Sequence, residues 1–210
     1  MVAKLTLHYA PQTRAFAVRT LLEELKAPYE LNVLTFKKDE QRAAAYLAIN
    51  PMGKVPAISH GDALITEQPA IFIYLADLFP AATLAPALTD PLRGPYLRWM
   101  VFYGSCFETA LVDKSMGHAP TRASTSPYGD YDTTMNTLGS QLAKGPYILG
   151  ETFSAADILW GTALAWTMIF KLVPETPVFA AYSARVNARP SMAFVRGEDA
   201  KLVAERDRDA

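Results

Sequence analysis

The sequence contains little cysteine and little net charge. Cys106 is the only cysteine among 210 residues, which excludes an internal disulfide, a Cys-X-X-Cys redox pair and a cysteine-based zinc site. The formal net charge is -1 and the isoelectric point is about 6.3, so the chain has no basic field for nucleic acid or an anionic membrane. Any thiol chemistry must therefore use a sulfur atom that a ligand brings.

Long apolar runs are also missing. No uninterrupted run reaches the roughly 18 residues that a membrane helix needs, and residues 1–5 enter a strand-like pattern without a charged leader and an apolar signal core. Hydrophobic residues make up 50% and charged residues 20%, a composition typical of globular domains. We expect a cytoplasmic protein with no membrane or nucleic-acid partner. None of the three histidines has a neighbour that suggests a metal site, so no metal is expected.

The first eighty residues alternate between strand and helix patterns. Strand formers alternate over 5–9, and apolar residues then recur at helical spacing up to Leu25. The pattern continues as a strand over 29–34, a helix over 39–49, two short strands over 57–59 and 63–65, and a helix after Thr66. This order, β-α-β-α-β-β-α, is that of a thioredoxin-like α/β unit, which we assign to residues 1–80.

The rest of the chain reads as helical. Residues 81–89 are proline-containing and aperiodic, so we interpret them as a linker, and we assign residues 90–210 to an all-α domain. Helical patterns cover 90–117, 128–144 and 178–188, and Glu198 begins what looks like a charged, frayed tail. Between them, Ser154 and Asp157 form the spacing of a capping box at the start of a core helix.

One stretch between the predicted second and third helices carries the functional signal. Val55-Pro56 directly precedes a strand, where proline can only open it because it has no N–H for the ladder. Thr66-Glu67-Gln68-Pro69 then looks like a helix start, and free N–H groups at such a start attract a carboxylate. Together these residues suit a short peptide that bears both an amine and a carboxylate. The alternative is an ordinary turn followed by a capped surface helix.

This stretch resembles the glutathione-binding half of the thioredoxin-like domain of glutathione transferases. The resemblance implies a cis bond before Pro56, pairing of the Val55 main chain with the cysteinyl part of glutathione, and binding of the γ-glutamyl end at Glu67 and Gln68. Gln68 stands where the family usually has serine, so an amide must replace a hydroxyl. Lys54 is the candidate for the glycyl carboxylate, with a solvated lysine as the alternative.

Activation of the glutathione thiol falls to the loop between the first strand and the first helix. Lowering a thiol pKa by about 2 takes roughly 2.7 kcal/mol of preferential thiolate stabilisation. Serine-type members have the hydroxyl where this chain has Ala10, and cysteine-type members have the thiol where it has Arg14. The remaining catalytic candidates are the hydroxyls of Tyr9 and Thr13 and the cation of Arg14. The alternatives are a packed strand aromatic for Tyr9 and a helix cap for Thr13.

The electrophile pocket is expected along the first long helix of the second domain. Trp99, Tyr103 and Phe107 lie at helical spacing and are the candidates for an apolar wall, with ordinary core as the alternative. The sequence therefore predicts a homodimeric glutathione transferase that uses glutathione as co-substrate and attacks a small apolar electrophile. Two alternatives stay open: a glutathione-dependent disulfide reductase or peroxidase, and a non-catalytic binding protein of the same fold.

Overall fold

The computed structural model describes residues 4–120 and 122–208. The chain divides into two compact units. The first contains the described residues up to Ala82 together with those from Arg189 onward, and the second runs from Thr83 to Ala188. The C-terminal helix therefore packs with the α/β unit, whereas the sequence analysis assigned it to the helical domain.

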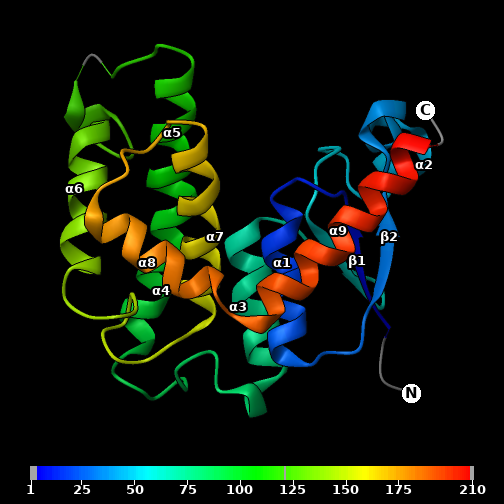
Figure 1. Ribbon diagram of the computed structural model, residues 1–210, viewed down its shortest axis with the longest axis horizontal. Coiled ribbons are helices and arrows are strands. Elements are labelled where there is room, and N and C mark those ends of the chain that lie inside the picture. Colours follow the sequence, from blue (N-terminus) through cyan, green and yellow to red (C-terminus); the bar gives the residue numbers. More distant parts are fainter. Residues whose placement is uncertain (1–3, 121, 209–210) are drawn as a thin grey trace. The chain divides into compact units, whose positions relative to one another are not determined.

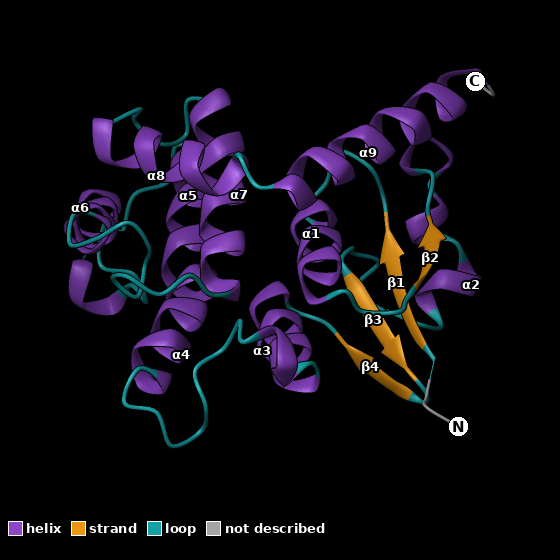
Figure 2. Ribbon diagram, turned by 60° about the horizontal axis from the view of Figure 1, so that its bottom comes forward, coloured by secondary structure: helices purple, strands orange, loops and turns teal. Residues whose placement is uncertain are grey.

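A four-stranded sheet forms the centre of the first unit (Figure 2). Its order is β2-β1-β3-β4, with β2 parallel and β3 antiparallel to β1, as expected for a thioredoxin-like fold. Three helices of the expected pattern accompany it. The elements are β1 (Leu5–Tyr9), α1 (Ala15–Leu25), β2 (Glu30–Val33), α2 (Ala44–Leu47), β3 (Ala57–His60), β4 (Ala63–Ile65) and α3 (Gln68–Leu78).

Helices α1 and α3 pack against each other and against the sheet, and α9 (Pro190–Arg208) lies alongside α1 (Figure 1). Leu5, Leu7 and Tyr9 are buried, and because strand side chains alternate, all three face the same side of the sheet. His8 faces the other side, where its ring lies 5.6 Å from the ring of Tyr46 of α2. The apolar core of the unit thus lies between β1 and the α1 layer.

Two local predictions were wrong. The helix expected over 39–49 is reduced to a 3-10 turn at Glu40–Arg42 and the single turn of α2, because Ala43 between them is extended, with φ -65° and ψ 145°. The frayed tail expected from Glu198 is instead part of α9, which continues to Arg208. Arg189 anchors the start of α9, because its Nε and Nη2 each donate to the Glu24 carboxylate at 2.7 Å.

The second unit is helical, as predicted. A turn of π-helix at Tyr103–Phe107 joins α4 and α5 into one continuous segment, and α7 packs against α8 and α4. Trp160 of α7 is fully buried. Among the described residues, no helix is both long and apolar enough to cross a bilayer. The elements are α4 (Arg93–Phe102), α5 (Glu108–Ser115), α6 (Tyr131–Leu142), α7 (Ala155–Ile169) and α8 (Pro177–Asn187).

The capping box predicted at the start of α7 is present. Asp157 accepts from the Ser154 N–H at 2.8 Å, and the Ser154 side chain completes the box. The same carboxylate accepts from the Ile148 N–H and the Tyr182 hydroxyl, each at 2.7 Å, and its side chain is inaccessible to solvent. Asp157 therefore joins the start of α7, the preceding loop and α8.

Candidate active site

Strand register brings the predicted binding residues to one edge of the sheet. His8 pairs with Ala57 in antiparallel register, so the loop that follows Tyr9 lies beside the start of β3. Ile58 pairs with Ile65, so the end of β4, which leads into α3, lies at the same edge. The β1–α1 loop therefore converges with Val55 and the amino end of α3, although it lies more than forty residues before them in the chain.

The main chain at Val55 has the geometry that the resemblance implied. The Val55–Pro56 bond is cis. The preceding carbonyl, of Lys54, accepts from the Tyr46 hydroxyl at 2.7 Å and from Nδ2 of buried Asn50 at 2.9 Å. Within residues 4–120 and 122–208, the Val55 N–H and C=O have no hydrogen-bond partner. The loop thus holds one peptide edge rigidly while leaving it open to an extended ligand.

The amino end of α3 has two unused N–H groups. Pro69 has none to offer, and the amides of Gln68 and Ala70 have no partner in the described part of the chain. Glu67, just before the helix, is exposed and has a φ of 62°. Such a conformation costs a non-glycine residue of the order of 1–3 kcal/mol and clusters at functional sites. This end of the helix can receive a carboxylate, with the Glu67 carboxylate beside it for an ammonium group.

Gln68 links this helix to the β1–α1 loop. Its Nε2 donates to the Arg14 carbonyl over 3.0 Å, while its Oε1 is buried and without a partner among the described residues. The amide that replaces the family's serine therefore ties together two of the three converging segments. Lys54 is exposed, beside Val55 in the sequence.

The catalytic candidates of the β1–α1 loop have different surroundings. The Thr13 hydroxyl donates to the Ala10 carbonyl over 2.7 Å and accepts from the Ala15 N–H at 3.2 Å, which is the arrangement of a helix cap. The Arg14 side chain is exposed. Thr13 and Arg14 therefore lie next to each other, directly before α1. The Thr13 hydroxyl must break its bond to the Ala10 carbonyl before it can donate to a ligand.

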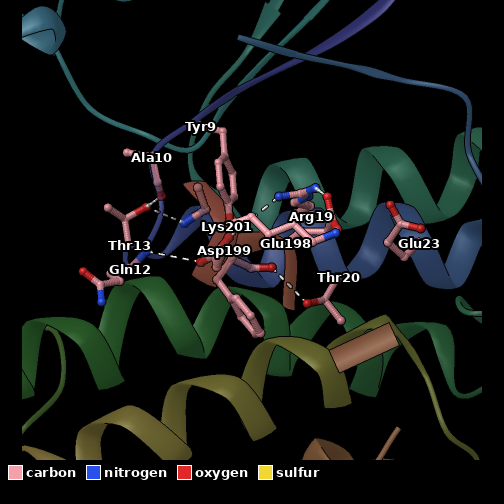
Figure 3. A network of polar contacts seen from close by, with 12 residues as sticks. Tyr9, Ala10, Gln12, Thr13, Arg19, Thr20, Glu23, Glu198, Asp199 and Lys201 are labelled. Carbon is pink, nitrogen blue, oxygen red and sulfur yellow. Dashed lines mark hydrogen bonds and ion pairs between the residues drawn. The ribbon is translucent and has the colours of Figure 1, made fainter. Parts of the chain in front are cut away.

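The Tyr9 side chain points toward α9. Its side chain is fully buried and its hydroxyl donates to Oδ1 of Asp199 in α9 (Figure 3). Burial, followed by the hydrogen bond to Asp199 and the charge of that carboxylate, raises the pKa of Tyr9 far above its ordinary value. The phenol therefore stays protonated and its single proton is engaged.

Sequence reasoning missed Asp199, the acceptor of that bond. Asp199 also accepts from the Gln12 N–H at 3.3 Å through Oδ2. One signal could have found it: Met192 and Val195 precede it at helical spacing and are buried, which places position 199 on the inward face of a helix. An aspartate at an apolar position of such a pattern indicates a buried polar contact.

The three residues predicted to line the electrophile pocket lie in the core of the helical unit. Trp99, Tyr103 and Phe107 are buried, and their rings lie 4.9 to 6.1 Å from the ring of Trp160. Of the three, Trp99 also borders a groove of about 460 Å³ between α4 and α6. The other residues that line the groove are polar: Arg98, Thr133, Asn136, Thr137, Ser140, Gln141 and Lys144. This placement favours the core alternative for Tyr103 and Phe107, and the polar groove suits an apolar electrophile poorly.

An α/β unit of thioredoxin-like topology, with a peptide edge at a cis-proline and an open helix start beside it, defines a class of small-peptide-binding protein. Comparison with known proteins is more specific. The glutathione S-transferase N-terminal domain family matches residues 3–77, and the glutathione S-transferase C-terminal domain family matches residues 128–185. The chain belongs to the glutathione S-transferase family.

Individual relatives match over nearly the whole chain. A glutathione transferase homologue from Sulfitobacter, solved with bound glutathione, is 30% identical, with 94% of this chain and 99% of that one covered and a TM-score of 0.75. A glutathione transferase structure from Methylococcus capsulatus is 27% identical, with coverages of 93% and 98% and a TM-score of 0.78. Glutathione S-transferase GstA of Escherichia coli O157:H7 is 26% identical, with coverages of 89% and 94%.

Proposed function

We propose that this chain is a glutathione transferase that binds glutathione along Val55 and delivers its thiolate to a small apolar electrophile. The observation that carries the proposal is the convergence of an unpaired peptide edge at Val55 with the open amino end of α3. The cysteinyl part pairs with Val55, the γ-glutamyl carboxylate meets the Gln68 and Ala70 amides, and its ammonium meets Glu67. Lys54 is the proposed partner of the glycyl carboxylate.

Thiol activation is assigned to Thr13, Arg14 and the amino end of α1. A hydroxyl donor, a cation and the positive end of a helix dipole each stabilise a thiolate more than a thiol. Tyr9 is the third residue that the sequence offered for this role, and its bond to Asp199 supports a structural part in the loop instead. In the reaction the thiol proton leaves to solvent, the sulfur forms a bond to the electrophilic carbon, and the leaving group departs with its electron pair.

The test combines calorimetry with a conjugation assay. Reduced glutathione titrated into the protein should release heat with one site per chain, and an aryl halide such as 1-chloro-2,4-dinitrobenzene should yield the conjugate. Glu67→Ala should weaken binding about tenfold, equivalent to about 1.4 kcal/mol. Glu151→Ala is the matched control, because Glu151 is exposed on the helical unit and lies outside the proposed site. Absence of binding would contradict the whole proposal.

A non-catalytic binding protein is the second candidate. The protons of Tyr9 and Thr13 are both engaged, with Asp199 and Ala10, which favours a site that binds glutathione without ionising it. Ultraviolet difference absorbance of bound glutathione separates the two, because only the enzyme lowers the thiol pKa. A protein that ionises the thiol but converts only a small disulfide or peroxide would instead be the reductase or peroxidase.

Assembly and location complete the proposal. We propose a cytoplasmic homodimer with no nucleic-acid or membrane partner, on the family resemblance and a net charge near zero. Sedimentation equilibrium should give twice the chain mass of 23.0 kDa. A single-chain mass at micromolar concentration would contradict the dimer and leave the binding proposal unaffected.

A further inference from the structure

Asp199 links the last helix of the chain to the loop that carries the proposed thiol chemistry. It is 8% exposed and accepts from two groups at the far end of the sequence, the Tyr9 hydroxyl and the Gln12 N–H (Figure 3). Tyr9 is the last residue of β1, and Gln12 directly precedes Thr13. One carboxylate thus accepts hydrogen bonds from the residues on either side of Ala10 and Pro11 in the β1–α1 loop.

One cation, that of Arg19, lies near both the Asp199 carboxylate and the neighbouring carboxylate of Glu198. Arg19 of α1 approaches Asp199 with Nη1 3.8 Å from Oδ1, and the same guanidinium lies 3.6 Å from Glu198 and over the Tyr9 ring. Burial raises the pKa of the Asp199 carboxyl, although the bonds from Tyr9 and Gln12 and the Arg19 charge act against that rise. Replacing a whole buried ion pair by well-packed apolar residues is often neutral or stabilising, whereas removing one partner alone is costly. The partners of Asp199 therefore explain why it is retained once present, but not why this position holds an aspartate.

The conformation of Gln12 supplies a reason. Its φ is 61°, in the left-handed region that non-glycine residues rarely adopt. Such a residue keeps its conformation only where the surroundings impose it, and Asp199 is the acceptor for its N–H. The direction in which the chain leaves Gln12 sets where Thr13 and the first turn of α1 lie.

We propose that Asp199 is a positioning residue for the thiol-activating loop: by holding Tyr9 and the strained Gln12, it fixes Thr13 and the start of α1 where they meet the glutathione sulfur. The proposal rests on the proposed function. Asp199 itself touches neither glutathione nor electrophile. Its effect is on the ionisation of the bound thiol, whereas the binding contacts at Val55, Glu67 and Gln68 lie on other segments.

The experiment measures the pKa of the glutathione thiol bound to the full-length protein, by ultraviolet difference absorbance, in the wild type and in variants. Asp199→Ala should raise the thiol pKa by about 1, from about 6.5 to about 7.5, which lowers the thiolate fraction at about pH 7 about threefold and should lower kcat by a similar factor. The KM for glutathione should change less than about threefold, because the binding contacts remain. Asp199→Asn keeps an oxygen for Gln12 and should restore most of the ionisation. Glu205→Ala, exposed on the same helix, is the matched control and should behave as wild type.

Gln12→Gly sharpens the test because glycine adopts a positive φ without strain. Without strain at position 12, the loop should keep its conformation better when the carboxylate is removed. The double variant Asp199→Ala/Gln12→Gly should therefore ionise more of the bound thiol than Asp199→Ala alone. If Asp199→Ala does not fold, Tyr9→Phe, which removes one of the two bonds, is measured in its place and should raise the thiol pKa by a smaller amount.

The outcomes separate the two proposals. A wild-type protein that ionises bound glutathione, with an Asp199→Ala variant that ionises it equally, would overturn the positioning role alone. Where both Asp199 variants fail to fold, a Tyr9→Phe variant that folds and ionises bound glutathione as well as the wild type would also overturn it. A wild-type protein that neither binds nor ionises glutathione would refute the proposed function and the positioning role with it.

Discussion

Each of the two units has a buried aspartate that accepts from a tyrosine hydroxyl and from backbone N–H groups. In the helical unit Asp157 binds Tyr182, Ile148 and Ser154, which lie 3 to 25 residues away. In the α/β unit Asp199 binds Tyr9 and Gln12, which lie 190 and 187 residues away. The chemistry is the same, but the first carboxylate starts a helix while the second holds a loop.

The difference lies in what each network supports. Both carboxylate oxygens of Asp157 accept hydrogen bonds from buried groups, so removal of the carboxylate leaves several donors buried without partners. Asp199 has a nearby cation and a strained loop residue as neighbours. We therefore expect loss of Asp157 to appear mainly in stability and loss of Asp199 mainly in glutathione chemistry.

The largest effect is expected from Asp157→Ala. The variant leaves the Ile148 and Ser154 amides and the Tyr182 hydroxyl buried and unpaired, and because each such donor costs about 1–3 kcal/mol, the loss should total about 3 kcal/mol or more. Urea unfolding should give a lower free energy of unfolding by that amount. Glu151→Ala, exposed in the loop before α7, should leave it unchanged. A cost below about 1 kcal/mol would remove the contrast between the two aspartates.

The anchor of α9 should give the next largest effect. Burial raises the pKa of Glu24, but hydrogen bonds from Arg189 and Ser191 outweigh it, so the carboxylate stays ionised and paired. Arg189→Ala removes a bidentate charged bond, which should lower the free energy of unfolding by about 1.5–3 kcal/mol. Lys37→Ala breaks the exposed pair with Asp207 at the other end of α9 and should have no measurable effect. Equal effects of the two variants would show that α9 is not held at Arg189.

Close packing of α7 on α8 brings Tyr182 to Asp157, and Gly161 permits it. A Cβ atom at Gly161 would come within 2.5 Å of the Val186 side chain. Gly161→Ala should therefore lower the free energy of unfolding by about 1–3 kcal/mol. Gly139→Ala in α6 is the control, because its Cβ would meet the Phe179 ring at an ordinary 3.7 Å and alanine favours the helix. Tolerance of Gly161→Ala in thermal unfolding would contradict this packing.

The smallest expected effect is on the pH dependence of the free energy of unfolding, to which His8 and Asp157 contribute with opposite sign. Burial lowers the pKa of His8 from 6.5, and its ring bridges Asn32 of β2 and Ser59 of β3, each over 2.9 Å. The unfolded chain then binds the proton more readily, so stability is present above pH 6.5 and is lost as pH falls through the lowered pKa.

Burial raises the pKa of Asp157, so protonation of that carboxyl favours the folded state instead, as pH falls through the raised pKa toward 3.8. Urea unfolding between pH 7 and 5 should therefore show stability falling with pH in the wild type and a flatter profile in His8→Gln. An unchanged slope in His8→Gln would exclude the histidine as the cause.

The sequence was sufficient for features that depend on neighbours in the chain. The capping box of Ser154 and Asp157 and the order of strands and helices in the first unit are local patterns, and both were predicted. The cis bond at Val55 followed from a short motif and a family resemblance. These features share one property: their partners lie within a few residues or in a repeated spacing.

Features that depend on distant packing could not be predicted. From Glu198 onward charged residues outnumber apolar ones, so this part of the sequence was predicted to be a frayed tail, whereas in the structure its residues up to Arg208 belong to α9, which packs against α1. The spacing of Tyr103 and Phe107 marked a buried helix face without showing that Trp160 fills the space in front of it. Tyr9 was correctly placed at the end of β1, but its partner comes from the other end of the chain.

The most direct test of the account is the pKa of glutathione bound to the wild-type protein, measured by ultraviolet difference absorbance of the thiolate across pH 5 to 10. Free thiols titrate near 8.5, and stabilisation by Thr13, Arg14 and the dipole at the amino end of α1 predicts a value lower by about 2. A bound thiol that still titrates near 8.5, or a protein that binds no glutathione, would contradict the proposed activity.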